Sequence, residues 1–185
     1  MGYREEAWIC SLSKVFDSIL MWSYYNKHKG VCIGLDIERT TKYLDVKQGM
    51  MVFNSGYEVK YQDIIEKPDY FRDSVDCFYY QMCTKAKEWE HEQEVRMFII
   101  NPSPMYMALP YKPKGKKQVI DWKEVRSYPR IGGECFDSIY MGVNIDQKIK
   151  TKILELSRKL NPDIKIYQMT VNPDAFKLDA IAINY

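Results

Sequence analysis

A carboxylate and a guanidinium lie two residues apart near the middle of the chain, at Glu94 and Arg96. If residues 94–100 form a strand, both side chains point to the same face of the sheet. A carboxylate there can act as a general base or hold a ribose hydroxyl, and a guanidinium can hold a phosphate or carboxylate through two hydrogen bonds. Charges are seldom buried without a partner, so a structural ion pair is the competing interpretation. The residue pattern leaves both open.

A second candidate lies near the N-terminus, in a predicted helix that carries Trp22, Tyr25 and Lys29. Their i, i+3, i+7 spacing puts the three side chains on neighbouring positions of one helical surface. Two rings and a cation suit a nucleotide or a sugar. The alternative is that the rings pack the helix against a sheet. We take all three as candidate ligand-binding residues.

Other patterns argue against several kinds of site. His28 and His91 are the only histidines, and the five cysteines show no C-x-x-C spacing, so neither a metal site nor a disulfide framework is predicted. Gly132-Gly133 lacks the lysine and the strand-to-helix context of a phosphate-binding loop. Four lysines in residues 112–117 are typical of a solvated loop tip, with a phosphate-contacting flap as the alternative.

The composition is that of a single-domain cytoplasmic protein, spanning residues 1–185. Apolar residues make up 46% of the chain, and 27 Lys+Arg against 25 Asp+Glu give a net charge of +2. A net charge near zero argues against a dedicated nucleic-acid binder. No apolar run approaches the roughly 20 residues that cross a bilayer, so no membrane partner is expected. A homo-oligomer is compatible with all of this.

The candidate residues need a framework of short strands and helices to position them. Apolar runs predict strands over residues 8–12, 31–35 and 94–100, and Gly30 is a natural end for the first helix. Asn54-Ser55-Gly56 between two apolar runs predicts a hairpin. A long helix is predicted from Pro68 to about Trp89, with Phe71, Val75, Phe78 and Met82 on one face.

The second half of the chain continues this pattern. Residues 101–117 read as a loop, since they contain several prolines. Strands are predicted over 137–141, 164–169 and 176–183, with a helix through Leu160 that Asn144 or Asp146 caps. About seven strands and about three packed helices make an α+β fold with a mixed, mostly antiparallel sheet.

Several runs carry a family resemblance. Cys10-Ser11-Leu12-Ser13 is a serine-ended strand, residues 20–25 hold a Met-Trp-x-x-Tyr helix, and Lys29-Gly30 starts the next strand. A lysine (Lys85 or Lys87), Trp89 and the Glu-x-Glu-x-Arg motif of Glu92, Glu94 and Arg96 follow, and then Ile139-Tyr140-Met141-Gly142 and Ile166-Tyr167. On these motifs nearly the whole chain resembles DUF2971, a family of uncharacterised bacterial domains.

The resemblance implies a partial match and a candidate function. Family members usually carry a preceding region with an Asn-Asp-Pro-type motif, so we expect this chain to correspond to the C-terminal part. The layout is also similar to that of ADP-ribosyltransferases, which use a strand-borne glutamate to hold a ribose hydroxyl and stabilise an oxocarbenium-like centre. Carried over by position, Glu94 would be the catalytic residue, and Trp22 or Tyr25 would stack on the nicotinamide or the adenine.

The sequence therefore supports two hypotheses of function. The first is a nucleotide-handling enzyme, with NAD as the candidate cofactor and a site between the Trp22 helix and the strand of Glu94 and Arg96. Trp89 joins the candidate ligand-binding residues through the motif it belongs to. The alternative is a non-catalytic module that binds a small ligand or a protein, for example in a phage-defence or stress system.

Overall fold

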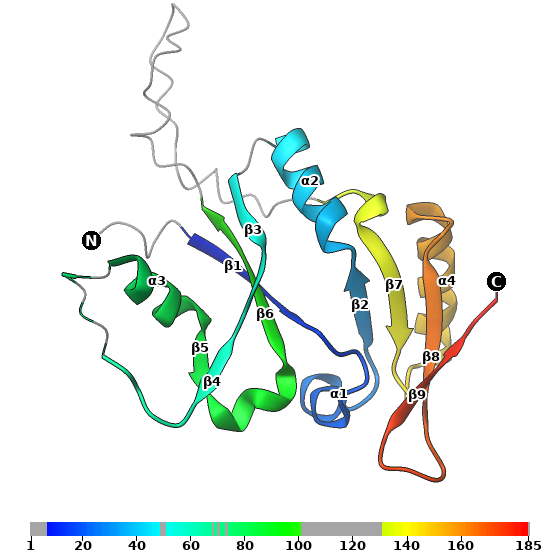
Figure 1. Ribbon diagram of the computed structural model, residues 1–185. Helices are drawn as coiled ribbons and strands as arrows, with labels where there is room; N and C mark the ends of the chain where they lie inside the picture. The colour runs from blue at the N-terminus through cyan, green and yellow to red at the C-terminus, as the bar shows by residue number, and fades with distance from the viewer. Residues whose placement is uncertain are drawn as a thin grey trace, which may run out of the picture.

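The protein is described here by a computed structural model, which covers residues 7–48, 51–67, 69, 71–72, 74–100 and 131–184. The nine described strands belong to three sheets (Figure 1). The first has the order β1-β6-β3, with β1 Ala7–Ser13, β6 Glu94–Ile100 and β3 Met51–Glu58. The second has the order β2-β7-β8-β9, with β2 Val31–Leu35, β7 Phe136–Met141, β8 Lys165–Val171 and β9 Leu178–Ala182. The third pairs β4 (Lys60–Gln62) with β5 (Thr84–Ala86) in parallel.

Four α-helices and two 3-10 helices connect these strands. They are α1 Ile19–Asn26, α2 Ile37–Gln48, α3 Ser74–Cys83 and α4 Gln147–Leu160, with η1 Lys87–Glu92 and η2 Gly133–Cys135. Most strand pairs are antiparallel, so the predicted α+β class is confirmed. The predicted strands divide between separate sheets instead of forming a single one. None of the helices in the described residues is long and apolar enough to cross a membrane.

Strand β6 is the central strand of its sheet. It pairs antiparallel with β1 on one side and with β3 on the other, and Arg96 lies opposite both Ser11 and Tyr57. Met97 and Phe98 are almost completely buried, which explains why apolar residues follow the charged start of the strand. The charged end of β6 therefore projects from a well-fixed strand.

The predicted hairpin around Asn54-Ser55-Gly56 is wrong. These residues lie within a single strand, β3, which pairs with β6 on both sides of an irregularity between Phe53 and Tyr57. Gly56 has a φ of 111°, so the glycine that suggested a turn allows a bulge to form. The bulge lets β3 continue along β6, where a turn would have ended the pairing.

The helix predicted from Pro68 to about Trp89 differs at both ends from the observed helix, α3. Helix α3 ends at Cys83, because Thr84–Ala86 pairs as β5 with β4 and the chain then forms η1. Lys85 therefore lies on a strand, and Phe71 lies before the helix with its side chain 97% exposed. The apolar helical spacing stops at Met82, one residue before the observed end. The sequence reasoning did not include α2, which begins where Asp36 Oδ1 accepts a hydrogen bond from the Arg39 amide at 2.9 Å.

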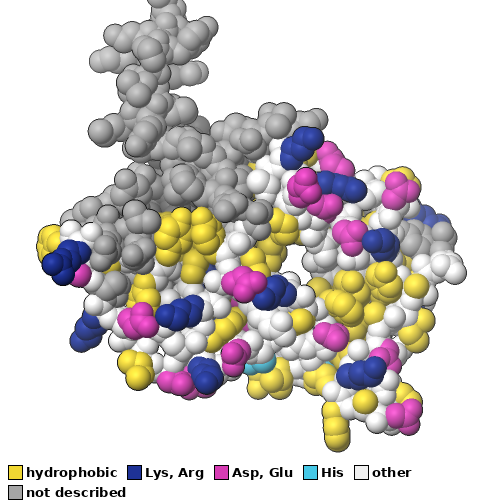
Figure 2. Space-filling view, viewed as in Figure 1, with side chains coloured by type: hydrophobic (Ala, Val, Ile, Leu, Met, Phe, Trp, Pro, Cys, Tyr) yellow, Lys and Arg dark blue, Asp and Glu magenta, His cyan; other side chains and the backbone are white. Residues whose placement is uncertain are grey.

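The four-stranded sheet packs against α4 and contains much of the core. Met141 and Ile166 are almost inaccessible, and Ile153 and Leu154 of α4 pack against them. Asp146 caps α4 by accepting hydrogen bonds from the amides of Lys148 and Ile149, and the helix runs to Leu160, as predicted. The lysine-rich segment 112–117 and the predicted loop 101–117 lie outside the described residues. On the face shown in Figure 2, acidic and basic side chains are interspersed, which matches the small net charge.

Candidate functional site

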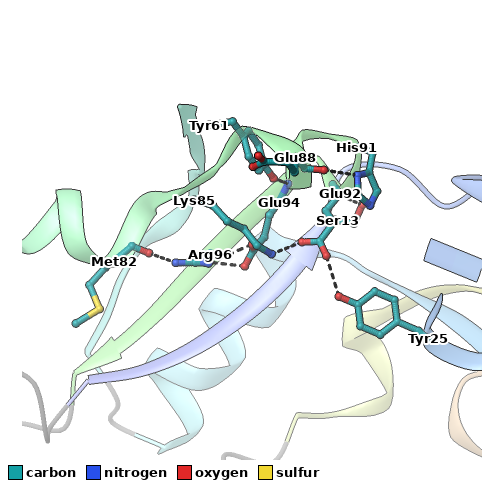
Figure 3. Close-up of polar contacts among 10 residues, drawn as sticks. All are labelled: Ser13, Tyr25, Tyr61, Met82, Lys85, Glu88, His91, Glu92, Glu94 and Arg96. Atoms are coloured by element: carbon teal, nitrogen blue, oxygen red, sulfur yellow. Dashed lines mark hydrogen bonds and ion pairs between the residues drawn. The ribbon is translucent and has the colours of Figure 1, made fainter. Parts of the chain in front are cut away.

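Side chains from the N-terminal and central parts of the chain meet around an open pocket of about 450 Å³. Met21 comes from α1. Figure 3 shows the others, with Tyr25 from α1, Lys85 from β5, Glu92 from η1, and Glu94 and Arg96 from β6. Strand β1 adds Ser11 and Ser13, which lie opposite Arg96 and Glu94 in the antiparallel ladder. The pocket therefore contains two carboxylates, two cations and a phenol.

Glu94 and Arg96 form a close pair on one face of β6. Arg96 Nε donates to Glu94 Oε1 at 2.8 Å, and Arg96 Nη2 donates to Glu94 Oε2 at 3.2 Å. The remaining Arg96 nitrogen, Nη1, donates to the backbone oxygen of Met82 at the end of α3. The Glu94 amide donates to the Tyr61 hydroxyl at 2.7 Å. These contacts fix the carboxylate in position, and the residue is only 6% exposed.

The environment of Glu94 keeps its carboxyl group ionised. Burial by itself would raise the pKa, but hydrogen bonds from Arg96, Ser11 and Lys85, together with the Arg96 charge, outweigh burial and lower the pKa to about 2. At neutral pH the side chain is therefore an anion. A carboxylate with so low a pKa is a weak base, so it suits accepting a hydrogen bond or stabilising a positive charge better than removing a proton.

Lys85 connects Glu94 to the second carboxylate. Its ammonium group donates to Glu94 Oε2 at 3.2 Å and also to Glu92 Oε2. Burial lowers the pKa of Lys85, but hydrogen bonds to both carboxylates more than compensate and raise it, so Lys85 stays charged. The Lys85 nitrogen also lies 5.0 Å from the centre of the Trp89 ring, a cation–π contact.

Glu92 faces the pocket because the chain turns sharply at Gln93. Gln93 has a φ of 44°, an unusual value for a residue other than glycine, at the junction of η1 and β6. The Lys14 amide donates to the Gln93 backbone oxygen at 3.1 Å, and the Ser13 hydroxyl donates to the Glu92 backbone oxygen at 2.7 Å. Strand β1 thus holds the junction so that Glu92 and Glu94 share Lys85.

Three of the predicted site residues meet at this pocket, and three lie elsewhere. Tyr25, Glu94 and Arg96 line it together. Trp22 is 7% exposed and packs with Met169 and Leu178, and it lines an adjoining cavity instead of this pocket. Its indole N–H donates to the Phe16 backbone oxygen at 2.7 Å.

Lys29 and Trp89 also lie outside the lining of the pocket. Helix α1 ends at Asn26, where Lys27 adopts a left-handed conformation, so Lys29 is not on the helical surface predicted for it. The reason is that the chain leaves the helix one turn before Gly30. Trp89 is half-exposed on η1, and its ring contacts the Lys85 ammonium group.

Sequence analysis assigned no role to Ser11, Ser13, Lys85 or Glu92, although Lys85 (or Lys87) and Glu92 belong to the motif on which the family resemblance rests. Strand alternation was the signal for the serines. Ser11 and Ser13 are two residues apart on β1, so they share a face of the strand, and they lie opposite Arg96 and Glu94 of β6. For Glu92 the signal was its spacing to Glu94. For Lys85 the signal was the lysine of that motif, but the predicted helix would have directed its side chain elsewhere.

The described residues contain no group of three or more His, Cys, Asp or Glu side chains placed to hold a metal ion. No protein-family model, curated protein or solved structure matches the chain. Arguments about function therefore depend on the geometry of the pocket.

Proposed function

We propose that this pocket binds a nucleotide-derived ligand such as NAD, and that the protein is an enzyme related to ADP-ribosyltransferases in mechanism. Membership in DUF2971, as its C-terminal part, belongs to the same proposal, as do a bacterial source and a cytoplasmic location. The observation that supports it most is the Glu94 carboxylate, which is ionised at neutral pH and held at an open pocket by Arg96 and Lys85.

The proposed cleavage of NAD needs a negatively charged group at the position of the Glu94 carboxylate. In the proposed step the bond between the ribose C1′ and the nicotinamide nitrogen breaks, and nicotinamide leaves with the electron pair. C1′ then carries positive charge, which a nearby carboxylate stabilises. Water adds to C1′ and loses a proton, so NAD and water give nicotinamide, ADP-ribose and a proton. A nucleophilic side chain of another protein could take the place of water.

A second cavity beside the pocket is suited to bind the planar ring of such a ligand. It has a volume of about 220 Å³ and is lined mainly by apolar and aromatic side chains, including Phe16, Trp22 and Cys32. Met21 and Tyr25 line both cavities, so the two adjoin. An apolar compartment beside an ionic one suits a ligand that joins a planar base to a hydroxylated sugar.

The test is incubation of the wild-type protein and a Glu94→Gln variant with NAD. We expect NAD to raise the melting temperature of the wild type, because a ligand that binds the folded state stabilises it. Mass spectrometry should detect nicotinamide with the wild type and not with Glu94→Gln. Glu58→Gln is the matched control, because Glu58 is in an exposed ion pair with Lys14. Nicotinamide release by all three proteins at equal rates would disprove the role of Glu94.

One observation favours the non-catalytic alternative. Both oxygens of Glu94 accept hydrogen bonds from Arg96, and Lys85 donates to one of them as well, so few acceptor positions remain for a substrate. A binding module for a small ligand would tolerate this saturation. Saturable binding of NAD without any nicotinamide release would establish that alternative.

A further inference from the structure

We propose that the Tyr25 hydroxyl occupies the position of a ribose hydroxyl on Glu92, and that ligand binding displaces it. This inference rests on the proposed function, and it assigns to Glu92 a role in ligand binding separate from that of Glu94. It implies that the pocket selects ligands that carry a free sugar hydroxyl.

The contact joins a buried acceptor to an exposed donor. The Tyr25 hydroxyl donates to Glu92 Oε1 at 2.8 Å, from α1 to the end of η1 (Figure 3). Glu92 is 4% exposed, whereas Tyr25 is 69% exposed. Because the ring is largely in solvent, it can leave by a change of rotamer without disturbing the core.

Glu92 is better suited than Glu94 to accept a ligand hydroxyl. An ionised carboxylate offers about four acceptor positions. Those of Glu94 face Arg96 and Lys85, as described above. Glu92 Oε2 faces Lys85, and Oε1 faces the movable Tyr25 hydroxyl. When Tyr25 moves away, a buried anion would lose a donor, which favours replacement by another hydroxyl.

Tyr25 resembles the proposed ligand group in its hydrogen-bonding chemistry. The hydrogen bond to Glu92 is the main cause that raises the pKa of Tyr25, so the phenol remains protonated and acts as a donor. A ribose hydroxyl would donate to the same oxygen in the same way. The protein thus keeps the Glu92 carboxylate hydrogen-bonded when no ligand is bound.

The experiment compares Tyr25→Phe with Tyr24→Phe. Tyr24 lies on the same helix and is 67% exposed, which makes it a matched control. The probes are NAD, adenosine and 2′,3′-dideoxyadenosine, and Kd is measured by calorimetry. Removing the competing phenol should lower the Kd of NAD and adenosine about fivefold in Tyr25→Phe. The Kd of the dideoxy probe should not improve, and Tyr24→Phe should match the wild type.

The possible results separate the two proposals. If the wild type binds none of the probes, the proposed function fails and this inference fails with it. If the wild type binds NAD but Tyr25→Phe binds it no more tightly, only the inference fails. Weaker binding by Tyr25→Phe would show that Tyr25 contacts the ligand directly. Failure of adenosine to bind, or equal tightening for the dideoxy probe, would also overturn the role of a sugar hydroxyl.

Discussion

Arg96 donates two hydrogen bonds to Glu94 although the two residues are neighbours on one face of the same strand. Such a pair connects no distant elements by itself. It gains structural importance because Arg96 also donates to the Met82 backbone oxygen and because Lys85 donates to Glu94 from β5. The same contacts that brace α3 and β5 against β6 hold an ionised carboxylate at the pocket, so bracing and function are not exclusive alternatives.

Replacing Glu94 with Gln should destabilise the protein without unfolding it. The amide keeps the shape of the side chain, but Arg96 loses its charge partner in a partly buried position. We expect a loss of about 1–3 kcal/mol in the free energy of unfolding, measured by urea denaturation. Glu58→Gln should cost less than about 1 kcal/mol, because exposed ion pairs contribute little. Equal losses in both variants would contradict the bracing role.

Acid should remove the stabilisation that Glu94 provides. Burial raises the pKa, but the donors around the carboxylate lower it further, to about 2 against an ordinary value of 4.5. Between these values the unfolded chain binds more protons than the folded one. The contribution is therefore complete above about pH 4.5 and is lost as the pH falls toward 2. Urea unfolding from about pH 7 to about pH 3 should show the advantage of the wild type over Glu94→Gln shrinking. A constant difference would contradict the low pKa.

Strands with strong apolar patterns could be predicted from the sequence, and pairing that depends on distant residues could not. Residues 31–35 and 94–100 match β2 and β6. The bulge at Gly56 was not predictable, because a glycine with positive φ serves equally in a turn and in a bulge. Whether β3 continues is decided by its pairing with β6, a contact between segments far apart in the chain.

For the site, the sequence indicated which residue types take part but not where their side chains lie in the fold. Strand alternation predicted that Glu94 and Arg96 share a face, and the structure confirms it. Trp22 is more buried than an open ligand platform would be, because a helical aromatic stripe does not reveal which ring faces the sheet. The direction of the Lys85 side chain could not be predicted from the local sequence, since it depends on the pairing of β5 with β4.

Gly142 should not tolerate a side chain. A Cβ there would lie 2.3 Å from the His28 backbone oxygen, and the Gly142 amide donates to the Gly30 backbone oxygen at 2.9 Å. Because the obstructing atom is backbone, Gly142→Ala should cost about 1–3 kcal/mol in urea denaturation. Gly132→Ala is the control, because its nearest neighbours are side-chain atoms of Glu134 and Tyr43, which can move. A loss in Gly142→Ala as small as in Gly132→Ala would show that the turn at His28 is not rigid.

Trp22 should behave as a core residue. Trp22→Phe removes apolar area from contact with Met169 and Leu178 and leaves the Phe16 backbone oxygen without its indole donor. We expect a loss of about 1–3 kcal/mol in the free energy of unfolding, whereas Tyr25→Phe should lose less than about 1 kcal/mol. In an NMR spectrum, the indole N–H signal that disappears in Trp22→Phe should be the one that exchanges slowly with deuterium in the wild type, because a buried hydrogen-bonded proton exchanges only after local opening. Rapid exchange of that proton would contradict the buried position of the ring.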